Sequence, residues 1–288
     1  MGIPFCEGEP LSSHSTFRIG GSARLFCSPT NLSQLVYILE CCKKEKIKRY
    51  ILGNGSNVLF SDEGFEGVVI HIGKALGAMS VKDNTITAGA GAMLSSLSRF
   101  AMEQGLSGLE FAAGIPGTVG GGIYMNAGAY GGEIRDVLVD AVFLDENNQL
   151  RTLPAEQLML GYRTSIFSQQ PWCLVQATFH LQADEPQQIQ ARMQHFMQSR
   201  REKQPLEYPS AGSTFKRPQG AYAAALIEQC GLKGYRVGGA AVSEKHSGFV
   251  VNLGGATCAD VIQLTEDVAR IVKEKTGFVL EREVRVVE

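Results

Sequence analysis

The sequence predicts an α+β protein of two domains. Its 288 residues are enough for about two domains and for a core that needs no disulfide or metal. Short β-like runs joined by tight turns alternate with amphipathic helical segments, and no internal repeat is present. The polar run Asp184-Glu185-Pro186 is typical of a domain boundary, with proline at a helix start.

The first domain is expected to begin with a βαβ unit. Residues 23–27 and 50–52 are β-like, and residues 31–46 carry leucine and valine at helical spacing. A strand is expected next, at 68–72. The remaining elements of this domain are two hairpins, a helix and a long strand, expected at 80–87, 137–153, 93–104 and 174–181.

The final hundred residues indicate a second unit. A helix from Pro186 to about Lys203 leads into a turn at 209–216. The elements expected after this turn are a short helix, two strands, a long amphipathic helix and a closing strand, at 221–229, 238–242, 249–252, 259–275 and 279–287.

The composition is that of an ordinary globular protein, with 44% hydrophobic and 19% charged residues. A net charge of −2 and a pI near 6.2 argue against binding to nucleic acid or to an anionic membrane. Seven cysteines lack metal-ligand spacing, so we expect no metal site and a reducing compartment. The sequence shows neither a signal peptide nor a stretch long enough to span a membrane, so we expect a cytoplasmic protein without membrane insertion.

The chain is organised around the segment 114–132, in which eight of nineteen residues are glycine and none is charged. Each glycine costs backbone entropy on folding, so this density favours a site where a large ligand approaches main-chain N–H groups closely. A flexible linker would be rich in serine and charge, whereas Ile115, Val119 and Ile123 are expected to be buried. We therefore interpret the segment as a cradle for the pyrophosphate of a nucleotide cofactor.

Two other glycine pairs could bind phosphate. Gly53-Asn54-Gly55-Ser56-Asn57 follows a predicted strand, but it lacks both the third glycine and the helix of a Rossmann site. Its turn can still present several N–H groups, so it is a second candidate for phosphate contact. Gly89-Ala90-Gly91 does open a helix, but Leu94 stands at the third fingerprint position, so a separate dinucleotide site is less favoured there.

Five motifs, in this order, resemble the UDP-N-acetylenolpyruvoylglucosamine reductase family. They are residues 53–59, residues 114–132, Tyr162-Arg163-Thr164-Ser165, residues 212–216 and residues 280–285. The resemblance covers nearly the whole chain. It implies an enzyme of peptidoglycan precursor synthesis that binds FAD non-covalently, uses NADPH, and reduces the enolpyruvyl ether of a UDP-sugar. The chain resembles the shorter form of the family. Only one helix fits between Leu181 and Ser213, where the longer form has an additional tyrosine-bearing loop.

The resemblance further implies a domain plan. Residues 1–183 would form a two-lobed FAD-binding domain of the vanillyl-alcohol oxidase/PCMH type, with lobes at about 1–73 and 74–183. Residues 184–288 would form a smaller α+β substrate-binding domain, whose C-terminal strand returns to the active site. We expect the protein to be a monomer.

In the implied reaction, hydride passes from NADPH to the flavin and then to C3 of the enolpyruvyl group, and negative charge develops at C2 and on the adjacent carboxylate. The resemblance assigns Arg163 to the carboxylate, Glu283 to the developing oxyanion and Ser213 to proton donation at C2. From the residues alone, Arg163 could be a surface or ion-paired arginine, Glu283 a solvated carboxylate at a strand end, and Ser213 a turn serine bonded to its own backbone.

The family correspondence also suggests binding residues. The residues expected to contact FAD are Gly53, Asn54, Gly55, Ser56, Asn57, Gly114, Ile115, Pro116, Gly117, Thr118, Gly120, Gly121, Asn126 and Gly128. Arg200 and Lys203 are expected to hold the UDP diphosphate, although cations at a helix C-terminus also complement the helix dipole. Lys216 and His246 are weaker candidates on the substrate side. His71 is expected to pack at the edge of the core and not to tether flavin covalently.

Two other functions remain open from the sequence. One is another flavin oxidoreductase of the same fold that acts on a small alcohol or hydroxy acid. Such an enzyme would share the glycine-rich segment but would not need Arg163, Ser213 and Glu283 in this order. The other is a nucleotide-binding regulatory protein without redox chemistry, which would not bind flavin.

Overall fold

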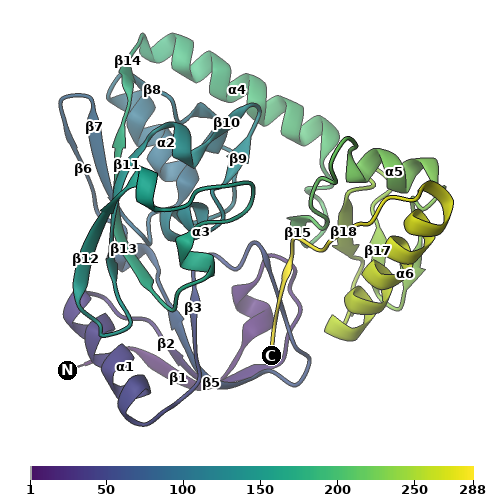
Figure 1. Cartoon of the computed structure of the whole chain (residues 1–288), viewed down its shortest axis with the longest axis horizontal. Coiled ribbons are helices and arrows are strands. Elements are labelled where there is room, and N and C mark those ends of the chain that lie inside the picture. Colours follow the sequence, from purple (N-terminus) through teal and green to yellow (C-terminus); the bar gives the residue numbers. More distant parts are fainter. Residues whose placement is uncertain (1) are drawn as a thin grey trace. The chain divides into compact units, whose positions relative to one another are not determined.

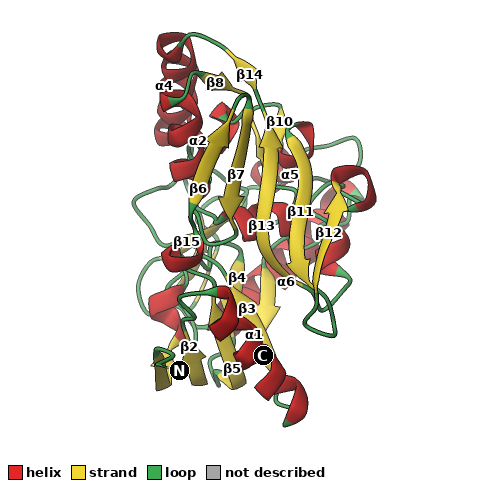
Figure 2. Ribbon diagram, turned by 90° about the vertical axis from the view of Figure 1, so that its left-hand side faces the viewer, coloured by secondary structure: helices red, strands yellow, loops and turns green. Residues whose placement is uncertain are grey.

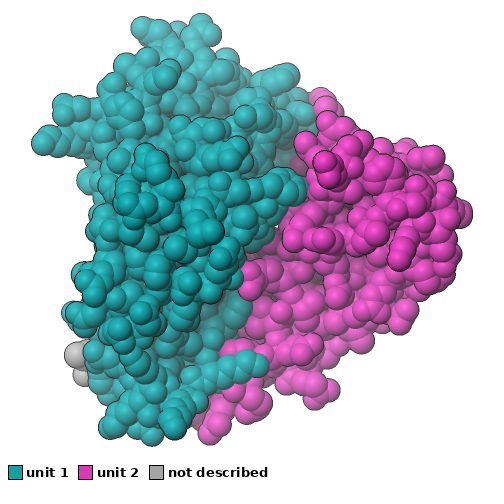
Figure 3. All heavy atoms as spheres, in the orientation of Figure 1, with its two compact units in different colours: residues 1–6, 26–54, 67–200 teal, residues 7–25, 55–66, 201–288 magenta. Residues whose placement is uncertain are grey.

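The structure, a computed structural model, describes residues 2–288 in two compact units (Figure 3). Unit 1 contains the residues up to Cys6, residues 26–54 and residues 67–200, and unit 2 contains residues 7–25, 55–66 and 201–288. The chain therefore passes between the units several times. The predicted boundary after residue 183 stays a prediction, because compactness does not reveal which ligand each part binds.

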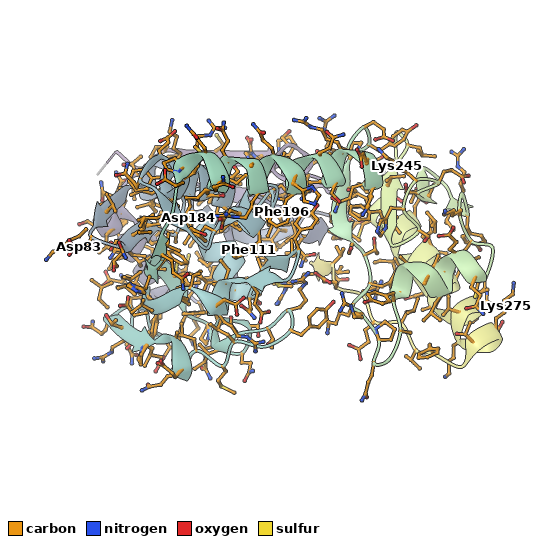
Figure 4. The ribbon with its side chains drawn as sticks, turned by 90° about the horizontal axis from the view of Figure 1, so that it is seen from above. Asp83, Phe111, Asp184, Phe196, Lys245 and Lys275 are labelled. Carbon is orange, nitrogen blue, oxygen red and sulfur yellow. The ribbon has the colours of Figure 1, made fainter. Side chains whose placement is uncertain are left out.

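Unit 1 contains a five-stranded antiparallel sheet in the order β12-β11-β13-β7-β6, and Figure 2 shows these strands side by side. Their bounds are β6 (Met79–Lys82), β7 (Thr85–Gly89), β11 (Leu138–Leu144), β12 (Leu150–Pro154) and β13 (Cys173–His180). Both predicted hairpins are confirmed. Their turns place Asp83 and Asn148 at positive φ, which short polar side chains tolerate, and Asp83 lies at the tip of its hairpin (Figure 4).

Four helices belong wholly or mainly to unit 1. They are α1 (Leu32–Lys44), α2 (Leu94–Glu103), α3 (Val119–Tyr124) and α4 (Pro186–Lys203). The α1 helix starts where predicted because the Asn31 side chain accepts a hydrogen bond from the Gln34 N–H at 3.0 Å. The α2 and α3 helices lie together beside the five-stranded sheet (Figure 1). Two short ribbons complete this unit, β8 (Leu106–Ser107) with β14 (Gln182–Ala183) and β9 (Gly128–Ala129) with β10 (Gly132–Glu133).

A second sheet has the order β1-β2-β5-β3, with β1 (Phe5–Pro10), β2 (Ser22–Cys27), β3 (Arg49–Leu52) and β5 (Phe65–His71). The predicted βαβ unit is present as β2, α1 and β3, and β5 is inserted between its two strands, parallel to β3. The β1 strand was not predicted. Most of its side chains are exposed, so it lacks the alternation of apolar residues that marks a half-buried strand.

Unit 2 contains a four-stranded sheet with two helices. The sheet order is β15-β18-β17-β16, with β15 (Ser210–Ser213), β16 (Arg236–Val237), β17 (Ala240–Val242) and β18 (Phe249–Asn252). The helices are α5 (Ala223–Gln229) and α6 (Cys258–Thr276). On α6 the residues Val261, Leu264, Val268 and Val272 are buried at helical spacing. This helix begins with a capping box of Thr257 and Asp260.

Two predictions for unit 2 were wrong in part. Residues 209–216 were expected to form a turn, but Ser210–Ser213 pair with β18 across a bulge, and Gly212 has a φ of +79°. The closing strand was expected over 279–287, but only β19 (Arg285–Val287) is regular, and it pairs in parallel with β4 (Val58–Phe60). Both differences depend on partners that are distant in the sequence.

A partly buried ion-pair network attaches α4 to the rest of unit 1, with Glu110 as its buried member. The Arg192 guanidinium donates to Glu110 Oε1 at 2.8 Å, to Ser107 Oγ at 3.1 Å and to Asp184 Oδ2. Asp184 lies at the start of α4 (Figure 4). Burial by itself raises the pKa of Glu110, but hydrogen bonds from the Gly108 N–H, Arg192 and Ser107 outweigh it and hold the pKa below its usual value.

An Arg192→Met variant should lose about 2 kcal/mol of unfolding free energy at pH 7, because it leaves the buried Glu110 carboxylate without its cation. The folded-state pKa of Glu110 is depressed, so its stabilisation is present above the unfolded pKa and is lost as pH falls through the folded value. The difference in unfolding free energy between the variant and the wild type should therefore become smaller below about pH 4. Urea unfolding followed by circular dichroism at pH 7 and at acidic pH measures this gap.

The control for this experiment is Arg270→Met. Arg270 makes i,i+3 and i,i+4 ion pairs on the exposed face of α6, at 3.2 Å and 3.4 Å. Because water screens such exposed pairs, they contribute little to the free energy of unfolding. Equal losses in the two variants, or a gap that stays constant down to low pH, would contradict the role given to Glu110.

Across residues 2–288, no helix is both long enough and apolar enough to cross a bilayer.

Candidate active site

The glycine-rich segment 114–132 forms a short helix and a ribbon instead of an open loop. Thr118 is the N-cap of α3, and its side chain accepts a hydrogen bond from the Gly121 N–H at 3.3 Å. The N–H groups of Val119 and Gly120 donate to the carbonyls of Ala92 and Ala90 at 2.7 and 2.9 Å. The N–H groups of Gly120 and Gly121, expected to contact FAD, therefore already have acceptors within the protein.

The beginning of the segment lies against the first glycine motif. Asn54 Nδ2 donates to the Pro116 carbonyl at 2.7 Å. A Cβ on Gly53 would lie 2.5 Å from Thr118 Oγ1, so glycine at 53 lets the Thr118 side chain lie this close to the Gly53 backbone. Two motifs that are sixty residues apart in the sequence thus meet in unit 1, as two parts of one predicted cofactor site should.

Four main-chain N–H groups indicate what can bind where the two glycine motifs meet. They belong to Gly53, Asn54, Gly117 and Thr118. Within residues 2–288, no protein group accepts a hydrogen bond from any of these four. Several main-chain donors without protein acceptors are the donor set that a pyrophosphate requires. The residues present therefore fit the phosphates of a dinucleotide such as FAD.

The rest of the first glycine motif belongs to unit 2. Gly55 has a φ of +62°, and a Cβ there would lie 1.9 Å from the His14 carbonyl oxygen. The Gly55 carbonyl accepts a hydrogen bond from the Thr16 N–H at 3.0 Å. In the described part of the chain, the N–H groups of Gly55 and Ser56 have no protein acceptor. In unit 2, these two N–H groups are main-chain donors that an anionic ligand could use.

Asn126 has a structural role that the sequence did not suggest. Its side chain is buried, its Nδ2 donates to Glu133 Oε2 at 3.0 Å and to the Gly161 carbonyl at 3.1 Å, and its Oδ1 accepts from the Arg135 N–H at 3.0 Å. The amide expected to contact FAD is thus used within the protein. It connects the glycine-rich segment to the turn that carries Arg163.

Arg163 lies in a tight turn between Gly161 and Thr164, whose backbones exchange hydrogen bonds of 3.1 and 3.3 Å. Its φ of +56° costs a non-glycine residue about 1 kcal/mol. The side chain is half-buried, donates from Nη2 to the Gly128 carbonyl at 3.4 Å and lies over the Tyr162 ring at 5.2 Å. The structure thus places the guanidinium at the glycine-rich segment, whereas a surface arginine would lie in solvent.

Arg200, near the end of α4, lies over the start of the same segment. Its Cδ and the Met197 sulfur are each 3.1 Å from the position that a Cβ on Gly114 would take. Burial lowers the pKa of Arg200 from its usual value, and no carboxylate within residues 2–288 pairs with it. One turn earlier, Phe196 stacks on Tyr130 of the glycine-rich segment at 4.6 Å; Figure 4 shows Phe196 on α4. A partly desolvated cation without a protein anion is suited to bind an anionic ligand group.

In unit 2, backbone hydrogen bonds bring Ser213, Glu283 and Asn57 together. Ser213 is the last residue of β15, and the next carbonyl, that of Thr214, accepts from the Glu283 N–H at 2.8 Å. Asn57 Nδ2 donates to the Glu283 carbonyl at 3.3 Å, and the Asn57 carbonyl accepts from the Arg285 N–H at 3.2 Å. Two predicted catalytic residues and one predicted cofactor residue therefore lie on neighbouring segments. Ser213 is exposed and Glu283 is half-buried.

The other predicted substrate residues differ in their surroundings. Lys216 Nζ forms an ion pair with Glu281 Oε2 at 3.1 Å, so this lysine already has a protein anion. Lys203 is exposed at the end of α4. His246 Nδ1 accepts from the Gly248 N–H at 3.2 Å, and burial lowers the pKa of the ring. His246 is therefore neutral near pH 7, and it can offer a ligand a hydrogen bond from Nε2 but no charge.

His71 is half-buried, and its ring lies 5.6 Å from that of Phe26 in a tilted contact. A Cβ on Gly73 would lie 2.9 Å from the His71 ring. These contacts are those of a packed side chain, as expected. Across residues 2–288, no cluster of three or more His, Cys, Asp or Glu side chains could hold a metal ion.

Two family models match the chain. One, described as FAD binding domain, matches residues 23–153. The other, described as UDP-N-acetylenolpyruvoylglucosamine reductase, C-terminal domain, matches residues 204–287. The two matches fall on the segments that carry the glycine motifs and on the segment that carries Ser213 and Glu283.

The chain is also similar to whole proteins. It is 47% identical to a UDP-N-acetylenolpyruvoylglucosamine reductase of Clostridium perfringens (strain SM101 / Type A), over 97% of this chain and 91% of that protein. The crystal structure of UDP-N-acetylenolpyruvylglucosamine reductase from Thermus caldophilus matches with a TM-score of 0.85 at 33% identity, over 100% of both chains. A solvent-stable cholesterol oxidase matches 63% of this chain and 38% of its own with a TM-score of 0.50 at 17% identity, which indicates a shared fold alone.

Proposed function

The chain belongs to the UDP-N-acetylenolpyruvoylglucosamine reductase family, and on this premise we propose that Arg163, Ser213 and Glu283 carry out the family's reaction. The protein is an FAD-containing oxidoreductase with the α+β fold of the vanillyl-alcohol oxidase/PCMH type. It reduces UDP-N-acetylglucosamine enolpyruvate with NADPH to give UDP-N-acetylmuramate, in the synthesis of peptidoglycan precursors. The two alternatives, a small-alcohol oxidoreductase and a non-redox protein, are thereby set aside.

We propose that the main-chain N–H groups of Gly53–Ser56, Gly117 and Thr118 bind the FAD pyrophosphate. This is supported by their lack of protein acceptors and by the contact between Gly53 and Thr118. When bound, FAD supplies the hydride that it has accepted from NADPH. We expect the bound FAD to be dissociable, since His71 is packed against Phe26 and Gly73.

Hydride addition at C3 of the enolpyruvyl group places negative charge at C2 and on the adjacent carboxylate. The Arg163 guanidinium is permanently charged and planar, so it can bind both carboxylate oxygens while this charge develops. In its protonated form Glu283 can donate a hydrogen bond to the same oxyanion. The Ser213 hydroxyl then gives its proton to C2, which completes the reduction.

The single observation that carries this proposal is the arrangement in unit 2. The Glu283 backbone is hydrogen-bonded to Thr214, which follows Ser213, and to Asn57 of a nucleotide motif. A solvated carboxylate at a strand end and a turn serine would have no reason to share such an arrangement with a cofactor loop.

We propose that Arg200 and Lys203 bind the UDP diphosphate. The two cations lie three residues apart near the end of α4, and they therefore face the same side of the helix. Arg200 is partly desolvated and lacks a protein anion, whereas Lys216 has Glu281 and His246 is neutral. We therefore rank Lys216 and His246 behind the α4 pair as substrate ligands.

Further proposals concern the organisation of the protein. Residues 1–183 would bind FAD and residues 184–288 would bind the UDP-sugar, with β19 returning beside β4 of the nucleotide motif. Between β14 and β15 the chain forms only α4 and a short connection, as the shorter form without the tyrosine loop would. We also propose that the enzyme is a cytoplasmic monomer.

The function is tested by mixing in two steps without oxygen. Purified protein loaded with FAD should lose its yellow flavin absorbance when NADPH is added, and should regain it when UDP-N-acetylglucosamine enolpyruvate follows. UDP-N-acetylglucosamine, which lacks the enolpyruvyl group, is the matched control and should leave the flavin reduced. Equal recovery with both sugar nucleotides, or recovery with neither, would contradict the proposed function.

A further inference from the structure

Residues 11–18, for which the sequence predicts neither helix nor strand, form an anchored segment of unit 2. The segment contains a 3₁₀ turn (Leu11–His14), and the side chains of Leu11 and Phe17 are fully buried. Phe17 belongs to the hydrophobic core formed by α5 and α6, and its carbonyl accepts a hydrogen bond from Asn252 Nδ2 at 3.1 Å. This part of the chain is therefore held firmly on both sides of Thr16.

Thr16 connects two of the segments described above. Its N–H donates to the carbonyl of Gly55, in the nucleotide motif, at 3.0 Å. Its Oγ1 donates to the carbonyl of Ser210, the first residue of β15, at 2.7 Å. Neither bond belongs to a helix or a strand ladder. One residue thus holds both the cofactor loop and the strand that ends at Ser213.

The β15 strand needs such an attachment. It is the edge strand of its sheet, and within residues 2–288 it pairs as a strand with β18 alone. Its register against β18 shifts between Ser210 and Ser213, and Gly212 between them has a φ of +79°. An edge strand with a bulge has fewer ladder hydrogen bonds than a regular central strand. The Thr16 hydroxyl adds a bond at the start of β15, to a core-anchored segment outside the sheet.

We propose that Thr16 is a positioning residue that sets the place of Ser213 relative to the loop Gly55-Ser56-Asn57 through its hydroxyl bond to Ser210. This inference rests on the proposed role of Ser213 as proton donor. Proton transfer requires a donor within hydrogen-bond reach of C2, and a misplacement of about 1 Å can cost up to a hundredfold in rate. Hydride transfer from NADPH to FAD does not use Ser213, so it should be insensitive to Thr16.

The test is a Thr16→Val variant, which keeps the shape of the side chain and the N–H bond to Gly55 but removes the hydroxyl. Its dissociation constant for FAD, measured by flavin fluorescence, and its rate of reduction by NADPH should stay within about twofold of wild type. Its rate of flavin reoxidation by the enolpyruvyl substrate should fall about tenfold. Thr16→Ser, which keeps a hydroxyl, should restore most of that rate.

The matched control is Thr276→Val. Thr276 Oγ1 also donates to a backbone carbonyl, that of Val272, at 2.7 Å, and it lies in unit 2 at the end of α6. This variant should leave both half-reactions unchanged. If Thr16→Val does not fold, Thr16→Cys, with a weaker donor, should show an intermediate and equally selective loss.

Three results would overturn the inference: an equal slowing of both half-reactions, an effect reproduced by Thr276→Val, or a failure of Thr16→Ser to restore the rate. A Ser213→Ala variant assayed in parallel separates this inference from the proposed function. Normal reoxidation in Ser213→Ala would overturn the role of Ser213 and the Thr16 inference with it. Loss in Ser213→Ala with normal reoxidation in Thr16→Val would overturn the Thr16 inference alone.

Discussion

A Ser213→Ala variant is expected to accept hydride from NADPH at the wild-type rate and to lose about 10³-fold in the product-forming step, because it cannot protonate C2. Ser213 ends β15 beside the Glu283 backbone, and it is exposed, so the substitution leaves no cavity and should not alter stability. Single-turnover measurements that follow flavin bleaching and recovery separate the two steps.

Two further variants sharpen this experiment. Ser213→Cys carries a stronger acid and should recover part of the lost rate if the side chain gives a proton. Ser80→Ala, an exposed strand serine of β6, is the control and should behave as wild type. Normal flavin recovery in Ser213→Ala would show that another group, or water, protonates C2.

An Arg163→Lys variant is expected to lose about 10²-fold in kcat/KM for the enolpyruvyl substrate, because an ammonium group cannot bind both carboxylate oxygens as the developing charge grows. Lysine and arginine meet the same penalty at a φ of +56°, so the backbone of the turn should be unaffected. Reduction of the flavin by NADPH should remain normal. Steady-state kinetics with varied substrate, combined with the bleaching rate, measure both expectations.

Arg99→Lys provides the comparison for Arg163→Lys. Arg99 is exposed on α2 in the same unit, so its replacement should have no effect on either half-reaction. Full activity in Arg163→Lys would mean that Arg163 has a structural role alone, through contacts such as those with the Gly128 carbonyl and Tyr162. Equal loss in both half-reactions would instead indicate damage to the cofactor site.

The sequence predicted those parts of the fold that local chemistry specifies. The bounds of α1, α4 and α6 were predicted to within three residues, because an N-cap asparagine, a helix-start proline and a regular apolar spacing each mark them. It missed several short elements, among them β1 and β15. These two strands and the irregular residues 279–284 depend on pairing with distant segments. No local pattern of side chains indicates that such pairing will occur.

In the candidate site too, local features could be predicted from the sequence, and features that depend on distant contacts could not. The two glycine motifs were identified from their composition, and the approach of Gly53 to Thr118 accords with that interpretation. The sequence could not indicate that Asn126 would be used within the protein, or that Gly120 and Gly121 would have backbone acceptors, because both follow from three-dimensional contacts. Thr16 was missed for the same reason, since it lies in a segment without helical or strand periodicity.

The parallel pairing of β19 with β4 affects how the chain acquires its structure during synthesis. Residues 285–287 complete an element whose other half, residues 58–60, leaves the ribosome more than two hundred residues earlier. A newly made β4 therefore lacks its parallel partner until residues 285–287 have been synthesised and have cleared the exit tunnel. This part of the enzyme therefore assembles late, and until then the open edge of β4 can pair with other chains.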